Sequence, residues 1–306
     1  MDIQDKLSAI INQLNTVIVG KFDQTQDCVA CLLAGGHLLI EDVPGVGKTT
    51  LAQALARTFG LQFSRVQFTT DLMPSDLSGV SVYERGQDRF VFHPGPLFAQ
   101  VLLADEINRA SPKTQSALLE AMEEKQVSIE GETRPLPSPF FVIATQNPLD
   151  QLGTYALPES QLDRFLMRIS LGYPDRAAER QLLLGQDRRA ILDTLPSLLN
   201  AGELTWLQAQ VQQVHTSEAL LDYVQDLVTA TRSGRWFVQG LSPRAGMAVL
   251  RAAKARALIN GRTFVAPDDV RGILAQTIAH RLIPAEDAGH GASAQVAAML
   301  DALPLP

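Results

Sequence analysis

Cysteine is scarce in this chain of 306 residues: there are two, Cys28 and Cys31, and both fall in one apolar segment. A C-x-x-C pair invites a zinc or thiol-redox interpretation. Zinc needs four ligands, however, no second pair follows, and the five histidines are scattered. The helical spacing of the segment favours core packing, and so little cysteine predicts a reducing, cytoplasmic compartment.

An excess of positive charge and long apolar runs are also missing. Lys and Arg number 26 against 33 Asp and Glu, a formal net charge of −7, which leaves no electrostatic footprint for nucleic acid. No stretch of about 18 apolar residues occurs, so we expect no membrane span. The acidic N-terminus (MDIQDKLSAI) does not resemble a signal peptide. The length suggests about two domains with a sizeable core.

A glycine-rich loop between an apolar run and a helix-period segment is the first positive signal. Leu38–Ile40 leads into this loop, and Lys48 and Thr49 follow it. In a phosphate-binding loop of this order, backbone N–H groups converge on an anion, the Lys reaches the β- and γ-phosphates, and the Thr hydroxyl ligates Mg²⁺. The alternative is a glycine-rich turn before an ordinary helix. The predicted nucleotide ligands are Pro44, Gly45, Val46, Gly47, Lys48, Thr49 and Thr50.

The loop departs at one position from the pattern G-x-x-x-x-G-K-[ST], which asks for glycine where this chain has Asp42. That glycine serves the turn that leaves the strand. Because Asp tolerates left-handed backbone geometry better than most residues, we expect Asp42 to take over the turn. The phosphate contacts come from the later glycines and should not suffer.

Two further apolar runs end in polar residues. Val101–Ala104 ends in Asp105, expected to hold Mg²⁺ through its water shell, and Glu106, expected to orient and deprotonate the attacking water. Phe140–Thr145 ends near Asn147, which could contact the γ-phosphate or that water from a strand between the other two. The alternatives are a solvated acidic turn and an Asn-Pro turn.

These motifs resemble those of the MoxR family of AAA+ ATPases, and the resemblance runs in family order from about Ile18 to about Leu282. It implies Mg²⁺-dependent hydrolysis of ATP to ADP by an oligomer, expected to be a hexameric ring. It also implies a chaperone-like role in remodelling or maturing partner proteins, often beside a partner with a von Willebrand factor A domain. The matching segments are VQFTTDLMPSDLSG (66–79), HPGPLF (93–98), DEINRA (105–110), ATQNP (144–148), LPESQLDRF (157–165) and LSPRA (241–245).

The resemblance assigns further roles. Arg164 falls where the family carries an arginine finger, which a neighbouring subunit supplies to stabilise transition-state charge; Arg168 is the alternative. Arg244 falls at sensor 2, and its action on its own or a neighbour's nucleotide stays open. Sensor 1 is assigned to Asn147 and the adenine-contacting segment to Val19 and Gly20.

Two hairpins are predicted as insertions. Residues 80–92 alternate apolar side chains around Gly86, and residues 127–135 place Glu130 and Gly131 in a turn. AAA+ proteins of the helix-2-insert group carry hairpins in both places and use them to meet partners or substrates. The alternative is that they are packing ribbons.

The alternation of strands and helices predicts an α/β core over residues 1–174, a P-loop AAA+ core with a parallel sheet and helices on both faces. Strand signals stop at Asp175, so residues 175–306 are predicted to form an all-α lid, with residues 187–202 as a connector. The expected helix caps are Asp175, Thr205 in a capping box with Gln208, Ser217 and Ser242.

Two other functions stay open. One is the motor subunit of a magnesium-chelatase-like or helicase-like complex, and the acidic net charge argues against the helicase. The other is a non-hydrolysing ATP-binding switch. Glu106 argues against the switch, because a module that never hydrolyses needs no positioned base.

Overall fold

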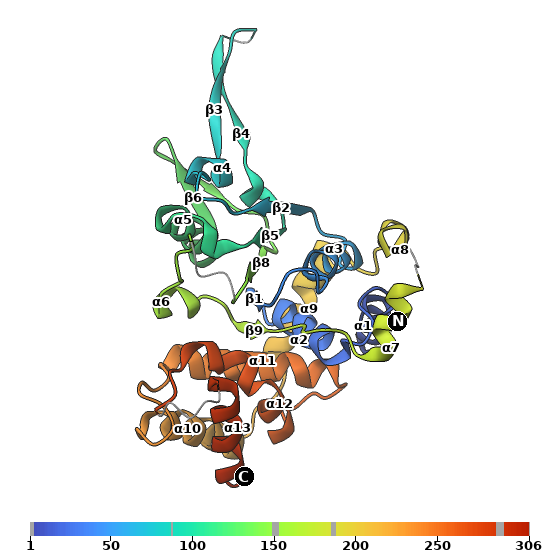
Figure 1. The fold of residues 1–306 in the computed structure, drawn as a ribbon, viewed down its shortest axis with the longest axis vertical. Coiled ribbons are helices and arrows are strands. Elements are labelled where there is room, and N and C mark those ends of the chain that lie inside the picture. Colours follow the sequence, from blue (N-terminus) through green and yellow to red (C-terminus); the bar gives the residue numbers. More distant parts are fainter. Residues whose placement is uncertain (1–2, 87, 149–152, 185–187, 286–290, 306) are drawn as a thin grey trace.

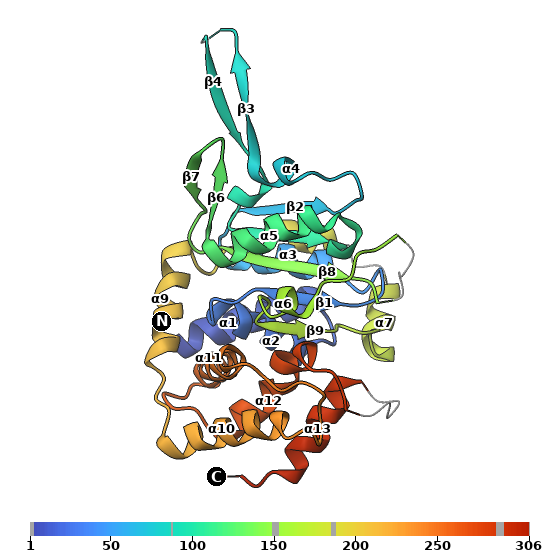
Figure 2. The same ribbon diagram turned by 90° about the vertical axis from the view of Figure 1, so that its left-hand side faces the viewer.

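The computed structural model describes residues 3–86, 88–148, 153–184, 188–285 and 291–305. Five parallel strands form its central sheet in the order β2-β5-β8-β1-β9. Figure 2 shows β2 toward the hairpins and β9 toward the C-terminal helices. The strands are β1 (Leu38–Glu41), β2 (Phe63–Gln67), β5 (Val101–Asp105), β8 (Phe141–Gln146) and β9 (Met167–Ile169).

Helices cover both faces of the sheet because successive strand residues point to opposite sides. On β1, Leu38 and Ile40 join a core cluster with α1 (Ile3–Val17), α2 (Phe22–Leu33) and α3 (Lys48–Thr58). Leu39 joins a second cluster with α5 (Pro112–Glu124). The predicted parallel sheet with helices on both faces is therefore confirmed.

Cys28 and Cys31 lie in the first cluster, on α2. Both are free thiols, fully buried, and burial raises the pKa of each thiol above its usual range. Among the described residues, no group of three or more His, Cys, Asp or Glu is arranged to hold a metal ion. The predicted packing role of the two cysteines is confirmed.

Both predicted hairpins are present. After α4 (Pro74–Ser78), β3 (Gly79–Glu84) pairs with β4 (Arg89–Pro94), and β6 (Gln126–Ile129) pairs with β7 (Glu132–Pro135). Glu130 and Gly131 have φ values of 53° and 83°, the left-handed geometry that a two-residue hairpin turn requires. The β3–β4 hairpin projects furthest from the sheet (Figure 1).

Helices dominate the described chain after β9, as predicted. Asp175 accepts a hydrogen bond from the Ala178 N–H, and Ser217 and Ser242 cap their helices in the same way. The boundary at residue 174 stays a prediction, since α8 packs against α1 and α3, and α11 packs against α2. In the parts of the chain that the structure describes, no helix has the length and apolarity needed to span a bilayer. The helices are α6 (Glu159–Leu162), before β9, and α7 (Arg176–Leu183), α8 (Arg188–Thr194), α9 (Ala201–Gln213), α10 (Glu218–Arg232), α11 (Pro243–Ile259), α12 (Pro267–Ile278) and α13 (Ala292–Ala302).

The predicted start of α9 at Thr205 is wrong. Asn200 accepts a hydrogen bond from the Glu203 N–H at 3.0 Å, and the Glu203 carboxylate accepts one from the Asn200 N–H at 3.0 Å. This is a capping box with Asn200 in the N-cap position, and the charge of Glu203 is favoured at a helix N-terminus. Thr205 lies inside the helix and donates to the Ala201 carbonyl. The predicted connector, residues 187–202, contains α8 and the start of α9.

Candidate functional site

The phosphate loop follows β1 and opens α3. Gly45 and Gly47 have φ values of 87° and 99°, and a Cβ at either position would meet nothing within 4 Å. Gly47 is the N-cap of α3 and supplies no side-chain cap, so the first N–H groups of the helix are available to an anion. Thr49 lies on the first turn, and its hydroxyl has no hydrogen-bond partner among the described residues. The loop therefore has the room and the donors for phosphate.

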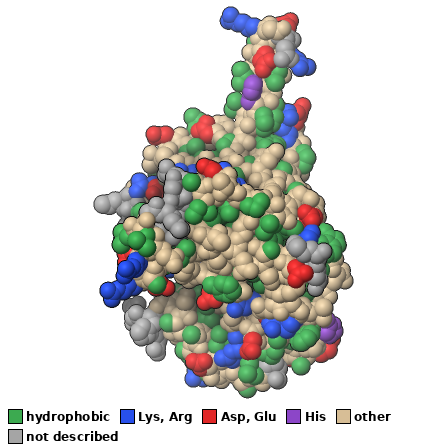
Figure 3. All heavy atoms as spheres, turned by 90° about the vertical axis from the view of Figure 1, so that its right-hand side faces the viewer, with side chains coloured by type: hydrophobic (Ala, Val, Ile, Leu, Met, Phe, Trp, Pro, Cys, Tyr) green, Lys and Arg blue, Asp and Glu red, His purple; other side chains and the backbone are tan. Residues whose placement is uncertain are grey.

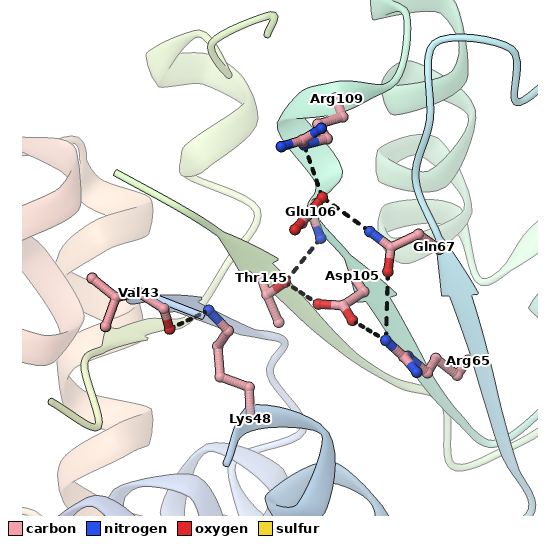
Figure 4. Close-up of polar contacts among 8 residues, drawn as sticks. All are labelled: Val43, Lys48, Arg65, Gln67, Asp105, Glu106, Arg109 and Thr145. Carbon is pink, nitrogen blue, oxygen red and sulfur yellow. Dashed lines mark hydrogen bonds and ion pairs between the residues drawn. The ribbon is translucent and has the colours of Figure 1, made fainter. Parts of the chain in front are cut away.

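Lys48 is held by the loop itself. Its Nζ donates to the Asp42 carbonyl at 2.7 Å and to the Val43 carbonyl at 3.1 Å. Figure 4 shows the contact with Val43. Partial burial lowers the pKa of Lys48, and Asp42, Asp105 and Glu106 oppose that shift. An ammonium has three donors, so one N–H remains for a phosphate oxygen.

Asp42 does not act as a left-handed turn residue, so that prediction is wrong: it is not among the described residues with positive φ. Its carboxylate instead accepts hydrogen bonds from the Val43 N–H at 2.9 Å, the Ser170 hydroxyl at 3.1 Å and the Gly172 N–H at 2.7 Å. A buried carboxylate needs such donors, and Asp42 is buried. It ties the phosphate loop to the chain that leaves β9.

Asp105 is held between two neighbouring strands. Its Oδ1 accepts a hydrogen bond from the Thr145 hydroxyl of β8 at 2.6 Å. Its Oδ2 pairs with the Arg65 guanidinium of β2 at 2.7 Å (Figure 4). A carboxylate has about four lone-pair positions, so it can keep these partners and still accept from the water shell of a metal ion.

Glu106 follows β5 in a left-handed backbone conformation, with φ 57° and ψ 51°, which costs a non-glycine residue on the order of 1 kcal/mol. The Thr145 hydroxyl accepts its N–H at 2.9 Å. Its Oε2 accepts from Gln67 Nε2 at 3.0 Å and Arg109 Nε at 2.8 Å (Figure 4). Thr145 therefore bridges Asp105 and Glu106 and sets their relative position.

Asn147 lies at the carboxyl edge of the sheet, the edge at which Asp105 and Glu106 follow β5. It follows β8, which lies between β5 and β1, and it is buried.

Val19 and Gly20 lie on the turn before α2, where a Cβ at Gly20 would come within 2.9 Å of Ala178 Cβ on α7. The chain that Asp42 binds leads directly into α7, which links this turn to the phosphate loop.

Arg164 lies at the amino edge of the sheet, opposite the phosphate loop. The chain just beyond it enters β9, where the Leu166 N–H donates to the His37 carbonyl at the amino end of β1. Arg164 and Arg244, on the first turn of α11, line one cavity of about 580 Å³. The alternative finger, Arg168, pairs with Glu41 of its own chain at 2.9 Å.

One carboxylate binds both of the predicted arginines. Glu123 Oε2 accepts from Nε and Nη2 of Arg164, each at 2.9 Å. Glu123 Oε1 accepts from Nη2 of Arg244 at 2.8 Å. These ion pairs lower the pKa of Glu123. The structure thus places the phosphate loop with Asp105, Glu106 and Asn147 at one edge, and the two arginines with Glu123 at the other.

Five residues that hold this site were not predicted from the sequence. Two of them, Gln67 and Thr145, are polar residues at or next to the carboxyl ends of strands, a position that could have marked them as candidates. Arg65 lies in the middle of β2. Arg109 and Glu123 carried no comparable signal. The five are Arg65, Gln67, Arg109, Glu123 and Thr145.

Comparisons with known proteins place the chain in a family. Residues 37–167 match the model of the ATPase family associated with various cellular activities (AAA), and residues 229–299 match the AAA lid domain. The chain is 44% identical to YeaC of Bacillus subtilis, over 100% of this chain and 96% of that protein. It is 42% identical to Chaperone MoxR1 of Mycobacterium tuberculosis, over 92% of this chain and 77% of that protein.

A solved structure agrees with the sequence relatives. The crystal structure of a Cytophaga hutchinsonii protein matches with a TM-score of 0.90 and 36% identity, covering 99% of this chain and 96% of that one. The phosphate loop and the two carboxylates fall inside the matched AAA model. The chain therefore belongs to the MoxR family of AAA+ ATPases.

Proposed function

We propose that this protein hydrolyses ATP in a Mg²⁺-dependent reaction and works as an oligomeric ring that remodels or matures protein clients. The observation that carries the proposal is the meeting of the phosphate loop with Asp105, Glu106 and Asn147 at the carboxyl edge of the sheet. Ligand crevices of open α/β sheets lie at that edge.

Each residue at this edge has a proposed task. The open glycines and the α3 N-terminus would bind the phosphates, and Lys48 would contact the β- and γ-phosphates. Thr49 would ligate Mg²⁺ directly, and Asp105 through water. When bound, the ion would neutralise charge that develops on the phosphates. Glu106, positioned by Thr145, Gln67 and Arg109, would take a proton from the attacking water.

The proposal of a ring rests on the two arginines. The four residues of β1 span about 13 Å, and Arg164 lies at the end of that span away from its own phosphate loop. Arg244 is bound to the same carboxylate as Arg164. We therefore assign both arginines to the nucleotide of a neighbouring subunit, in a ring that the family resemblance makes hexameric.

Client contact is assigned to the β3–β4 hairpin. Large apolar side chains stay exposed along it, and Phe90 reaches 72% exposure. Figure 3 shows this hairpin as a protrusion with hydrophobic side chains between charged ones. Exposed apolar groups of this kind mark interaction sites, and one relative is named a chaperone. A von Willebrand factor A domain protein is the proposed partner. The exposed residues are Val80, Val82, Tyr83 and Phe90.

Mixing two inactive variants tests the proposed function. Arg164→Ala should bind ATP but lose about 10³-fold or more in turnover, and Lys48→Ala should lose nucleotide binding. Together they should recover part of the wild-type phosphate release, because some interfaces pair an intact loop with an intact arginine. No recovery, together with a monomer by light scattering in ATP, would refute the ring and favour the non-hydrolysing switch.

A further inference from the structure

Glu123 occupies a position from which it reaches two separate parts of the chain. It lies on the last turn of α5, a helix of 13 residues and therefore about 20 Å long. Arg164 precedes β9, whereas Arg244 opens α11 in the C-terminal helical region. The two arginines meet because each binds one oxygen of this carboxylate.

The geometry leaves both arginines able to bind another anion. A guanidinium carries five N–H donors. Arg164 directs its Nε and Nη2 to Glu123, and Arg244 directs only its Nη2 there. Each side chain thus keeps N–H groups that do not point at Glu123. The carboxylate holds the arginines without consuming their capacity to bind phosphate.

The cavity around the pair is rich in positive charge. Lys125, Arg251, Lys254 and Arg281 line it beside the two arginines, and Asp163 and Glu123 are its acidic residues. Asp163 pairs with Arg281 at 3.2 Å. Asp163 also attracts Arg244, but less than Glu123 does, and Glu123 binds both arginines. Glu123 is therefore the main carboxylate that offsets the mutual repulsion of Arg164 and Arg244, and without it these like charges would move apart.

We propose that Glu123 is a positioning residue that sets the spacing of Arg164 and Arg244 for the nucleotide of the neighbouring subunit. This inference rests on the proposed function. The inference adds to that function the residue that makes two arginines, from distant parts of the chain, act as one unit. Glu123 itself would touch no nucleotide.

The first test is Glu123→Gln, which keeps the shape of the side chain and removes its charge. We expect kcat for ATP to fall about tenfold to a hundredfold, as for a catalytic group misplaced by about 1 Å. KM should change less than about twofold, because the arginines act on the transition state. Glu124→Gln is the matched control. It removes the same charge from the next residue, whose side chain has no hydrogen-bond or ion-pair partner among the described residues, and it should keep wild-type kcat.

A second test locates the defect. Glu123→Gln mixed with Lys48→Ala should recover activity, whereas Glu123→Gln mixed with Arg164→Ala should not, because both lack the same half of the site. In a protein that already carries Arg164→Ala and Arg244→Ala, adding Glu123→Gln should slow turnover no further. Glu123→Asp should restore part of the lost kcat, since it restores the charge.

The outcomes separate this inference from the proposed function. If Arg164→Ala and Lys48→Ala fail to complement each other, the proposed ring falls. If they do complement but Glu123→Gln hydrolyses ATP like Glu124→Gln, the positioning role alone falls. It falls equally if Glu123→Gln slows the protein that already lacks both arginines. If Glu123→Gln unfolds at a lower temperature than wild type, the Glu123→Asp variant decides the question. A Glu123→Asp protein with the melting temperature of wild type but a reduced kcat supports the positioning role. A Glu123→Asp protein with the kcat of wild type overturns it.

Discussion

The two edges of the central sheet differ in the sign of their charge and in how their residues are held. At the carboxyl edge, Lys48 faces three acids, Asp42, Asp105 and Glu106. Carbonyls of its own loop hold Lys48, and side chains of the two adjacent strands hold Asp105. At the amino edge cations predominate, and Glu123 joins arginines from distant segments. In the proposed function each edge carries one half of the machinery for phosphate transfer, and the positive charge of the amino edge would complement the acidic residues of a neighbour's carboxyl edge.

Glu106→Gln should have the largest effect, and it acts on the carboxyl edge alone. Gln fills the same space but cannot take a proton, so we expect turnover to fall about 10²- to 10⁴-fold while ATP still binds. Phosphate release and nucleotide titration measure the two quantities. Glu120→Gln, an exposed residue on α5, is the control. Normal phosphate release by Glu106→Gln would exclude it as the base.

Asp42→Ala should separate stability from chemistry at the same edge. The change leaves the Gly172 N–H and the Ser170 hydroxyl without their acceptor. Losing hydrogen bonds to a buried carboxylate should lower the free energy of unfolding by about 3 kcal/mol and weaken ATP binding. Urea denaturation checks the first effect, and Asp42→Asn, which keeps one acceptor oxygen, should lose less. An unchanged midpoint would mean that the contact to the end of β9 contributes nothing.

Arg244→Ala tests whether Arg244, the predicted sensor 2 residue, acts together with Arg164 on a neighbour's nucleotide or on the nucleotide of its own subunit. Removing one charge-assisted hydrogen bond to phosphate should cost about tenfold to a hundredfold in kcat. Because Arg244 shares Glu123 with Arg164, we expect Lys48→Ala to rescue it in mixed oligomers, as it should rescue Arg164→Ala. Rescue of Arg164→Ala without rescue of Arg244→Ala would place Arg244 on its own subunit's nucleotide.

The smallest expected effect is on the pH dependence of stability, and it comes from replacing His37, which lines the amino-edge cavity. Its Nδ1 accepts the Val142 N–H at 3.0 Å, and burial lowers its pKa to about 4 from a usual value of 6.5. The unfolded chain therefore binds more protons between these values, so stability falls as the pH drops through that window. Asn at this position can still accept from Val142 but does not titrate.

The advantage of wild type over His37→Asn should consequently shrink by about 2 kcal/mol between pH 7 and pH 5. Urea denaturation at the two pH values measures it. Asp27, whose pKa burial raises to about 6, shifts stability in the opposite direction, but equally in both proteins, so it cancels in the difference. A constant difference would show that His37 titrates normally in the folded protein.

The parts of the candidate site that could be predicted from the sequence are those whose residues are adjacent in the chain. The phosphate loop, the Asp105–Glu106 pair and the two hairpins each occupy one short stretch, and local patterns suffice for them. The start of α9 was misplaced because Asn200 with Glu203 and Thr205 with Gln208 have the same spacing. The charge of Glu203, which a helix N-terminus favours, is what distinguishes the first pair. Glu123 was missed because 41 and 121 residues separate it from its two arginines, and no local pattern reports contacts over such distances.

The placement of the half-sites at opposite edges also bears on stoichiometry. In the proposed ring, the contacts between chains would be heterologous, joining two different surfaces head to tail. An open row would leave an unmatched phosphate loop at one end and an unmatched arginine pair at the other, and so one site fewer than chains. Closing the row would complete the last site, so in the proposed ring ATP bound between subunits would stabilise the closed form at every interface alike.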